Sequence, residues 1–430
     1  MSRRIPPVID FIISLPQIGI AINIPNKLRR KTQIITITIK LINLNELGKF
    51  CKKGSLFITY LIIWAKLKHI IIKPLINLLK LQKNMLFCIN IKNLMKKTVF
   101  FLTFITLFIS CNQKKSLNLV KFNGEAQGTY YAITYYDENS TNYQIEVDSI
   151  LDAFDMCVSL WEPNSLICHA NRNDSSIVLD SKFTDIFYKS MRISEETEGA
   201  FDVTIGQLVN AWGFGFESRT KLNQYKIDSL LKFIGYKSVK LIDGKLRKEN
   251  PNTKIDFNAI AQGYSSDVIA KFLESKGINN YLIDIGGEVI GKGKKTDNAP
   301  WIVGIEKPAK ESNDERVLEA KVKLNDKALA TSGSYRKYYE ENGIRYSHTI
   351  DPKTGYPVKH TLLSASVLAD KCWEADAYAT AFMVMGLEKS KEFLIKNKNI
   401  EAYFIYSDEN GNIKTFTSNG LKKLLEEIKD

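Results

Sequence analysis

The spacing of apolar residues from about residue 120 to the C-terminus predicts a folded domain of mixed helices and strands. Stretches rich in β-branched and aromatic residues and bounded by Gly or turn residues predict strands, and apolar residues three or four positions apart predict helices. Strands are expected at 128–136, 254–257, 281–285, 301–306, 362–368 and 401–406, and helices at 146–160, 182–197, 225–234, 263–276 and 372–385. They interleave without a regular βαβ order, which predicts an α+β fold of largely antiparallel sheet with flanking helices over residues 120–430.

Residues 1–94 have a different composition. Their apolar runs are interrupted by Lys and fall short of the roughly 20 residues that span a bilayer. They hold 16 of the 60 Lys and Arg residues but only two of the 47 Asp and Glu residues, so the +13 net charge lies here and the rest of the chain is close to neutral. Nucleic-acid binding is therefore not expected of the folded part. We interpret residues 1–94 as a segment that is not a native folded domain, with a basic membrane-surface segment as the alternative.

Residues 95–111 have the anatomy of a secretory signal peptide. A positive start, Met-Lys-Lys, precedes an apolar stretch at 99–109 that is too short for a transmembrane helix, and Ser110 and Cys111 close it. The position of Cys111 resembles that of the lipidated Cys in bacterial lipoproteins, and residues 112–119 read as a polar tether. Three further Cys, at 157, 168 and 372, show no metal-binding spacing, so buried free thiols are expected, while one disulfide among them stays open.

The pair Asp376 and Thr380 is a candidate metal site. Both fall on the expected helix 372–385, where positions four apart share a face, so a carboxylate and a hydroxyl would point the same way. Such hard oxygen ligands suit Mg²⁺, which keeps few protein ligands and lets phosphate oxygens complete its shell. The alternative is an Asp that stabilises the helix N-terminus, with Thr380 as filler.

Three other stretches carry candidate binding chemistry. Small residues at 256–264 would let a phosphate approach free N–H groups at a helix start, although an ordinary strand-to-helix connection has the same pattern. Asp202 beside Phe201 could hold a planar ring, or the two could be a capping Asp and a core Phe. His348 precedes a strong turn signal at 351–355, where a structural His is the alternative to a catalytic one.

These stretches follow one another in an order that resembles the full motif series of the ApbE flavin transferases. The series runs GAFDVT at 199–204, WGFG at 212–215, DFNAIAQGY at 256–264, IGGE at 285–288, ATSGSY at 330–335, HTIDPKTG at 348–355 and ADAYATA at 375–381. The resemblance implies an ApbE-like fold, related to the T-fold. It also implies a reaction in which FAD binds with Mg²⁺, a Ser or Thr hydroxyl of a partner protein attacks the FMN-side phosphorus, FMN becomes attached through a phosphoester bond and AMP leaves.

The resemblance also implies roles for individual residues. The family's Mg²⁺ ligands are matched by Asp376, Thr380 and the main-chain carbonyl of Ala261. His348 and Asp256 are the candidates for taking the proton of the attacking hydroxyl. An FAD-contacting segment falls at Ala200, Phe201 and Asp202, and further flavin-contact positions fall at Gln127, Trp161, Asn258, Tyr264 and Ile350. Asn171 ends the stretch 165–171, which resembles another motif on the adenine side or phosphate side of FAD. Gln262 stands where many members have Lys, and Ala379 where a second Asp would stand, so this chain has less charge near the pyrophosphate.

The main hypothesis is therefore an exported, lipid-anchored FAD:protein FMN transferase. Mg²⁺-dependent hydrolysis of FAD to FMN and AMP is the alternative within the same site, and a non-catalytic FAD-binding lipoprotein is the alternative from another class. The expected location is the periplasmic side of a bacterial membrane, the inner membrane being favoured. Expected partners are FAD and the membrane through the lipid anchor, and the family resemblance implies acceptor subunits of membrane redox complexes with a short Ser/Thr motif.

Overall fold

The structure is a computed structural model. It describes residues 117–428, apart from 216–219, 309–316, 335–337 and 342–343, together with three short strands near the N-terminus. These are β1 (Ile13–Leu15), β2 (Ile20–Ile22) and β3 (Ile39–Leu41), which pair antiparallel within a unit covering Met1–Gln113. The expected signal peptide at 95–111, the lipidation site Cys111 and most of the tether at 112–119 lie outside the described residues.

The second unit, Lys114–Asp430, is built on an eight-stranded sheet in which every neighbouring pair is antiparallel. Across the sheet, the strands are β17 (Ile413–Thr417), β16 (Glu401–Ser407), β15 (Leu362–Ala369), β12 (Lys327–Gly333), β9 (Glu288–Lys292), β8 (Tyr281–Ile285), β5 (Thr129–Asp137) and β4 (Asn118–Ala126). Near the edge, β5 alternates between buried and less buried positions, whereas the central β15 is buried at almost every position. This difference is typical of a sheet whose centre is covered on both faces.

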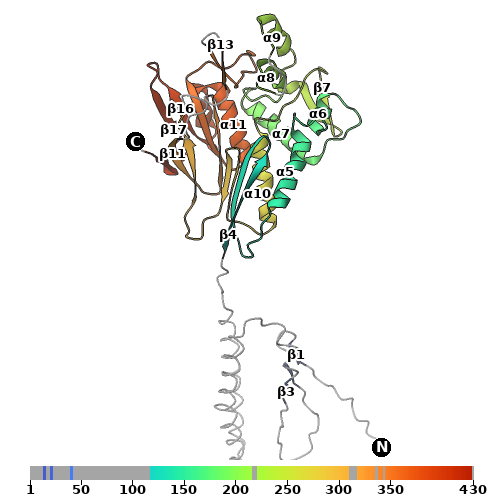
Figure 1. Cartoon of the computed structure of the whole chain (residues 1–430), viewed down its shortest axis with the longest axis vertical. Helices are drawn as coiled ribbons and strands as arrows, with labels where there is room; N and C mark the ends of the chain where they lie inside the picture. The colour runs from blue at the N-terminus through green and yellow to red at the C-terminus, as the bar shows by residue number, and fades with distance from the viewer. Residues whose placement is uncertain are drawn as a thin grey trace, which may run out of the picture. The chain divides into compact units, whose positions relative to one another are not determined.

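The described part of this unit has the helices α5 (Gln144–Val158), α6 (Leu166–Asn171), α7 (Ser181–Glu196), α8 (Gly206–Trp212), α9 (Gln224–Leu231), α10 (Ala261–Ser275), α11 (Cys372–Met385) and α12 (Leu387–Lys396). Helices α5, α10, α11 and α12 contact strands of the large sheet, whereas α8 and α9 pack on each other in a separate apolar cluster. Among them, α10 and α11 pack directly on the central strands and against each other (Figure 1). Two hairpins complete this part of the chain: β6 (Val239–Ile242) with β7 (Lys245–Lys248), and β13 (Tyr338–Glu341) with β14 (Ile344–Ser347).

A smaller antiparallel sheet covers the other face. Its strands are β10 (Trp301–Glu306), β11 (Leu318–Leu324) and β18 (Leu425–Glu427). Buried residues of this sheet, such as Trp301 and Val322, form one apolar cluster with Leu329 and Leu368 of the large sheet. The described part of the unit therefore has three layers, and the predicted α+β class with antiparallel sheet and flanking helices is confirmed.

Most of the expected elements are present, with one clear error. The strand predicted at 281–285, the strand at 301–306 and the helix at 372–385 have the observed bounds. The strand predicted at 254–257 is wrong, because this segment forms no strand and its main chain pairs with a side chain instead. The predicted helix 225–234 ends earlier, at Leu231. The residues between Leu231 and Gly235 form tight turns instead. The three Cys of the described residues are free thiols, with Cys157 and Cys372 buried and Cys168 partly exposed.

Candidate functional site

The start of α10, with Ala261, lies beside α11, which carries Asp376 and Thr380. Asp376, on the second turn of α11, is 9% exposed, and its Oδ2 accepts a hydrogen bond of 3.0 Å from the Gly263 N–H in the first turn of α10. A Cβ on Gly263 would lie 2.5 Å from the Cys372 carbonyl oxygen and 2.7 Å from the Asp376 Cβ. The two helices can therefore approach this closely only with glycine at 263. Ala261 is the first residue of α10, and Thr380 lies one turn beyond Asp376 on α11.

The environment of Asp376 favours a cation. Burial raises the pKa of this carboxyl to about 7, and the hydrogen bond from Gly263 opposes that rise. Among the residues that the structure describes, Asp376 forms no ion pair, so a buried negative charge here has no cationic partner. Carboxylate, hydroxyl and carbonyl oxygens fit Mg²⁺. Since no group of three His, Cys, Asp or Glu suited to a metal occurs within the described ranges, water or phosphate oxygens would have to complete its shell.

Asp256 lies in the segment that leads into α10. Its backbone N–H donates to the Val203 carbonyl at 2.7 Å, and a Cβ on Gly206 would stand 3.2 Å from the Asp256 Cβ. The segments around 203–206 and 254–258 are therefore in contact. Burial raises the pKa of Asp256 to about 6, against hydrogen bonds from the backbone and side chain of Asn258. A carboxylate with this pKa is mostly ionised at neutral pH and can accept a proton.

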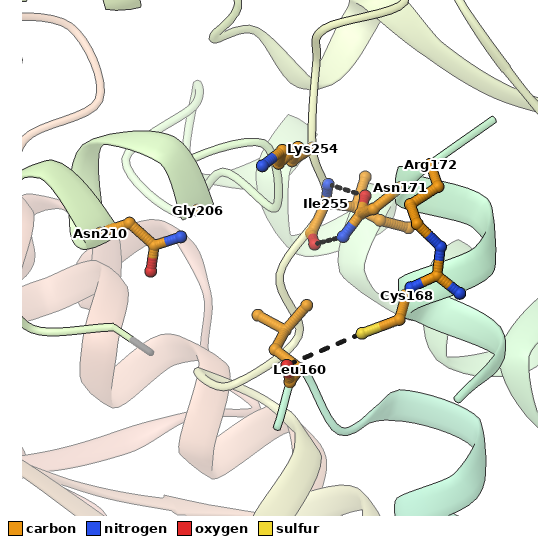
Figure 2. A pocket seen from close by; sticks show the side chains of 8 residues that line it. All are labelled: Leu160, Cys168, Asn171, Arg172, Gly206, Asn210, Lys254 and Ile255. Carbon is orange, nitrogen blue, oxygen red and sulfur yellow. Dashed lines mark hydrogen bonds between the residues drawn. The ribbon is translucent and has the colours of Figure 1, made fainter. Parts of the chain in front are cut away.

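A cavity of about 170 Å³ has in its lining Lys254 and Ile255, the two residues that precede Asp256 in the chain (Figure 2). It is lined by Leu160, Cys168, Asn171, Arg172, Gly206, Asn210, Lys254 and Ile255. Asn171, the last residue of α6, binds the main chain of Ile255 twice: its Nδ2 donates to the Ile255 carbonyl at 2.9 Å, and its Oδ1 accepts from the Ile255 N–H at 2.8 Å. These bonds fix the wall of the cavity next to Asp256. Trp161, which follows the lining residue Leu160, is 58% exposed.

The segment 200–202 is packed into the protein. Phe201 is 3% exposed and belongs to the main apolar core. The Oδ1 of Asp202 accepts from the backbone and hydroxyl of Thr204, and its Oδ2 accepts from the Tyr236 N–H at 2.8 Å. Burial raises the pKa of Asp202. These contacts match the alternative of a core Phe and a capping Asp, and an FAD contact of Ala200, Phe201 or Asp202 stays a prediction.

Two further predicted flavin contacts are engaged within the protein. Tyr264 is 6% exposed, stacks on Phe154 with ring centres 5.4 Å apart and donates its hydroxyl to Asp185 at 2.8 Å. Ile350 is 4% exposed and lies in a small apolar cluster with Trp212. Neither side chain is in the lining of the cavity described above, and their contact with a flavin stays a prediction.

The remaining predicted residues are exposed or only partly buried. The Oε1 of Gln127 accepts from Ser265 on α10 at 3.1 Å, while its buried Nε2 has no hydrogen-bond partner among the described residues. Asn258 is exposed, and its N–H donates to Asp256 at 2.7 Å. His348 is partly buried, with its ring 6.3 Å from that of Phe214. The sequence reasoning missed the cavity residues Arg172 and Lys254, although both adjoin positions that it named.

The comparisons agree on one family. The model of the ApbE family matches residues 127–404. A Haemophilus influenzae protein named FAD:protein FMN transferase is 36% identical to this chain over 328 residues, which are 73% of this chain and 93% of the relative. The Escherichia coli K12 protein of the same name is 33% identical over 335 residues, which are 74% of this chain and 94% of the relative. The solved flavin transferase ApbE from Vibrio cholerae superposes with a TM-score of 0.65 at 33% identity, covering 72% of this chain and all of that one. This chain therefore belongs to the ApbE family.

Proposed function

We propose that this protein is a Mg²⁺-dependent FAD:protein FMN transferase, which attaches FMN from FAD to a Ser or Thr of an acceptor protein and releases AMP. The observation that carries the proposal is the buried Asp376 carboxylate, which accepts a hydrogen bond from the first turn of α10, the helix that begins at Ala261, while Thr380 follows one turn later on α11. The names of the relatives in two bacterial species support the activity. Bound Mg²⁺ would supply positive charge at the pyrophosphate, where a P–O bond must break.

The protein's own part is to hold the reacting groups in line and to remove a proton. The acceptor hydroxyl oxygen forms a bond to the FMN-side phosphorus, and the bond from this phosphorus to the bridging oxygen breaks, so that AMP leaves with that oxygen. Asp256 suits the role of base because its pKa of about 6 keeps it ionised at neutral pH and Asn258 orients it. His348 is the second candidate for the same proton.

The cavity beside Asp256 would hold one part of the dinucleotide. Its volume of about 170 Å³ is below the roughly 300–1,000 Å³ that are typical of whole-ligand pockets. Arg172 and Lys254 bring positive charge to its wall, which suits an anionic ligand. The chain runs from this wall through Asp256 and Asn258 to Ala261, so one continuous segment connects the cavity with the proposed metal ligands.

One incubation separates the candidate functions. The purified protein is mixed with FAD, Mg²⁺ and an acceptor protein carrying a flavinylation Ser or Thr, and the products are identified by mass spectrometry. An acceptor heavier by one FMN residue, with AMP released, is the expected result. Free FMN and AMP with an unlabelled acceptor would identify a pyrophosphatase instead. FAD that stays intact would contradict both reactions and leave only binding.

We also propose that the protein is a lipoprotein on the periplasmic side of the inner membrane, where it modifies subunits of membrane redox complexes. The signal-peptide pattern at 95–111 and the position of Cys111 support this location. Labelling cells with a fatty acid analogue tests it. Label on the wild-type protein and none on the Cys111→Ala variant is expected, whereas an unlabelled wild-type protein would overturn the anchor.

A further inference from the structure

The helices α10 and α11 share an unusual way of satisfying their N-termini. The first N–H groups of a helix have no partner within the helix and usually bind a side chain at the N-cap position. The N-cap of α10 is Ile260 and that of α11 is Lys371, and neither side chain caps its helix. For both helices, the acceptor of a first-turn N–H is a side chain of the neighbouring helix.

Each helix donates a first-turn N–H to a carboxylate of the other. The Gly263 N–H of α10 donates to Asp376 of α11 at 3.0 Å, and the Trp373 N–H of α11 donates to Asp267 of α10 at 3.0 Å. The Cys372 N–H adds a second donor to Asp267. Donor and acceptor are four residues apart on α10 and three on α11, so the two contacts lie one helical turn apart and form a reciprocal pair.

This pair defines how the two helices are aligned along each other. The second hydrogen bond, one turn away from the Gly263 contact, ties the N-terminus of α11 to α10 at a second point, in addition to the packing of α11 on β12 and β15. Asp267 is 6% exposed, so its carboxylate is committed to this role within the protein. The helices are in close contact at Gly263, since a Cβ there would lie only 2.5 Å from the Cys372 carbonyl oxygen.

We propose that Asp267 is a positioning residue for the metal site: by capping α11 it holds Asp376 and Thr380 opposite the Ala261 carbonyl. The inference rests on the proposed function, since it concerns the same ligands. Asp267 is not one of the proposed ligands, because its carboxylate accepts hydrogen bonds from the backbone N–H groups of Trp373 and Cys372. Partners that orient metal ligands in this indirect way are worth about 10–100-fold in metal affinity.

The test compares three variants of the full chain. Asp267→Ala removes the acceptor, Asp267→Asn keeps a side-chain oxygen that can accept from the Trp373 N–H, and Glu274→Gln is the matched control. Glu274 lies on the same helix, and its carboxylate accepts hydrogen bonds from Tyr281 and Lys292 rather than from a backbone N–H of α11. Mn²⁺ is the probe, and its binding is measured by electron paramagnetic resonance in the presence of FAD and without an acceptor.

The expected result is a Mn²⁺ dissociation constant raised about tenfold or more in Asp267→Ala, largely restored in Asp267→Asn and unchanged in Glu274→Gln. Hydrogen exchange should quicken at the Trp373 amide in Asp267→Ala alone. Equal Mn²⁺ binding by wild type and Asp267→Ala would overturn the positioning role and leave the proposed function intact. If the wild-type protein bound no Mn²⁺, the metal site itself would fail, and this inference with it. If Asp267→Ala does not fold, Asp267→Asn becomes the deciding variant. Its Trp373 amide should then exchange at the wild-type rate, and faster exchange would show that the capping role is wrong.

Discussion

Replacing Gly263 by Ala should separate the two helices that carry the proposed metal ligands. The added methyl group would lie 2.5 Å from the Cys372 carbonyl oxygen and 2.7 Å from the Asp376 Cβ. Since ordinary contacts begin near 3.4 Å, α10 and α11 would have to move apart by roughly 0.9 Å. The obstructing oxygen belongs to the main chain and cannot rotate away as the end of a side chain could.

That displacement is large on the scale of the site. It would stretch the 3.0 Å hydrogen bond between Gly263 and Asp376 to roughly 3.9 Å, beyond the range of a hydrogen bond. Overpacking of this kind costs about 1–3 kcal/mol of unfolding free energy, and the better helix propensity of Ala returns about 1 kcal/mol. We therefore expect a modest net loss of stability, of about 0–2 kcal/mol, together with a large effect on the site.

The assay is the rate of FMN transfer as a function of Mg²⁺ concentration. Gly263→Ala should need about tenfold more Mg²⁺ for half-maximal rate, while its melting temperature falls by only a few degrees. Gly304→Ala is the control: its methyl group would meet the Leu318 Cδ2 at 2.4 Å, but that side-chain end can rotate, and β10 lies in the other sheet layer. A Gly263→Ala protein with the Mg²⁺ requirement of wild type would refute the reasoning.

Three other variants test the rest of the site. With Asp256 as base, the transfer rate of wild type should rise with pH through about 6. Asp256→Asn should lose that rise and about 100-fold or more of the rate. An Asp256→Asn protein with the pH profile of wild type would point to His348 as the base. Trp161→Ala should weaken FAD binding by about 3–10-fold and leave kcat unchanged, because an exposed aromatic ring can stack on a planar ligand. A fluorescence titration measures the FAD affinity, and an unchanged affinity would exclude the contact. Asn171→Ala leaves both main-chain groups of Ile255 without their partner, so chemical denaturation should show a loss of about 1–3 kcal/mol, and a loss near zero would contradict this.

The sequence predicted the parts of the fold whose signals are local. The helix at Cys372–Met385 and the strand at Tyr281–Ile285 begin and end at Gly or turn signals, and their bounds were correct. The segment 254–257 has the composition of a strand, yet its Ile255 pairs with the side chain of Asn171, 84 residues earlier. No local pattern can reveal such a contact, because it depends on where α6 lies after folding.

The candidate site was predictable to a similar degree. The four-residue spacing placed Asp376 and Thr380 on one face of a helix, and the motif order connected Ala261 with them. The reciprocal capping by Asp267 was not predictable in this way, because it depends on the packing of two helices that are far apart in sequence. For Asp202, the structure adds that both carboxylate oxygens accept hydrogen bonds within the described protein, while the ligand contact that its motif suggested stays a prediction.

The most direct test of the central claim is the amount of FMN joined to an acceptor protein by wild type and by Asp376→Ala at saturating FAD and over a range of Mg²⁺ concentrations. Wild type should label the acceptor only with Mg²⁺ present. Asp376→Ala should remain folded and lose roughly 100-fold or more of the rate, because the buried carboxylate that would hold the cation is gone. Labelling by Asp376→Ala at the wild-type rate and with the wild-type Mg²⁺ dependence would contradict the metal site on which the proposed function depends.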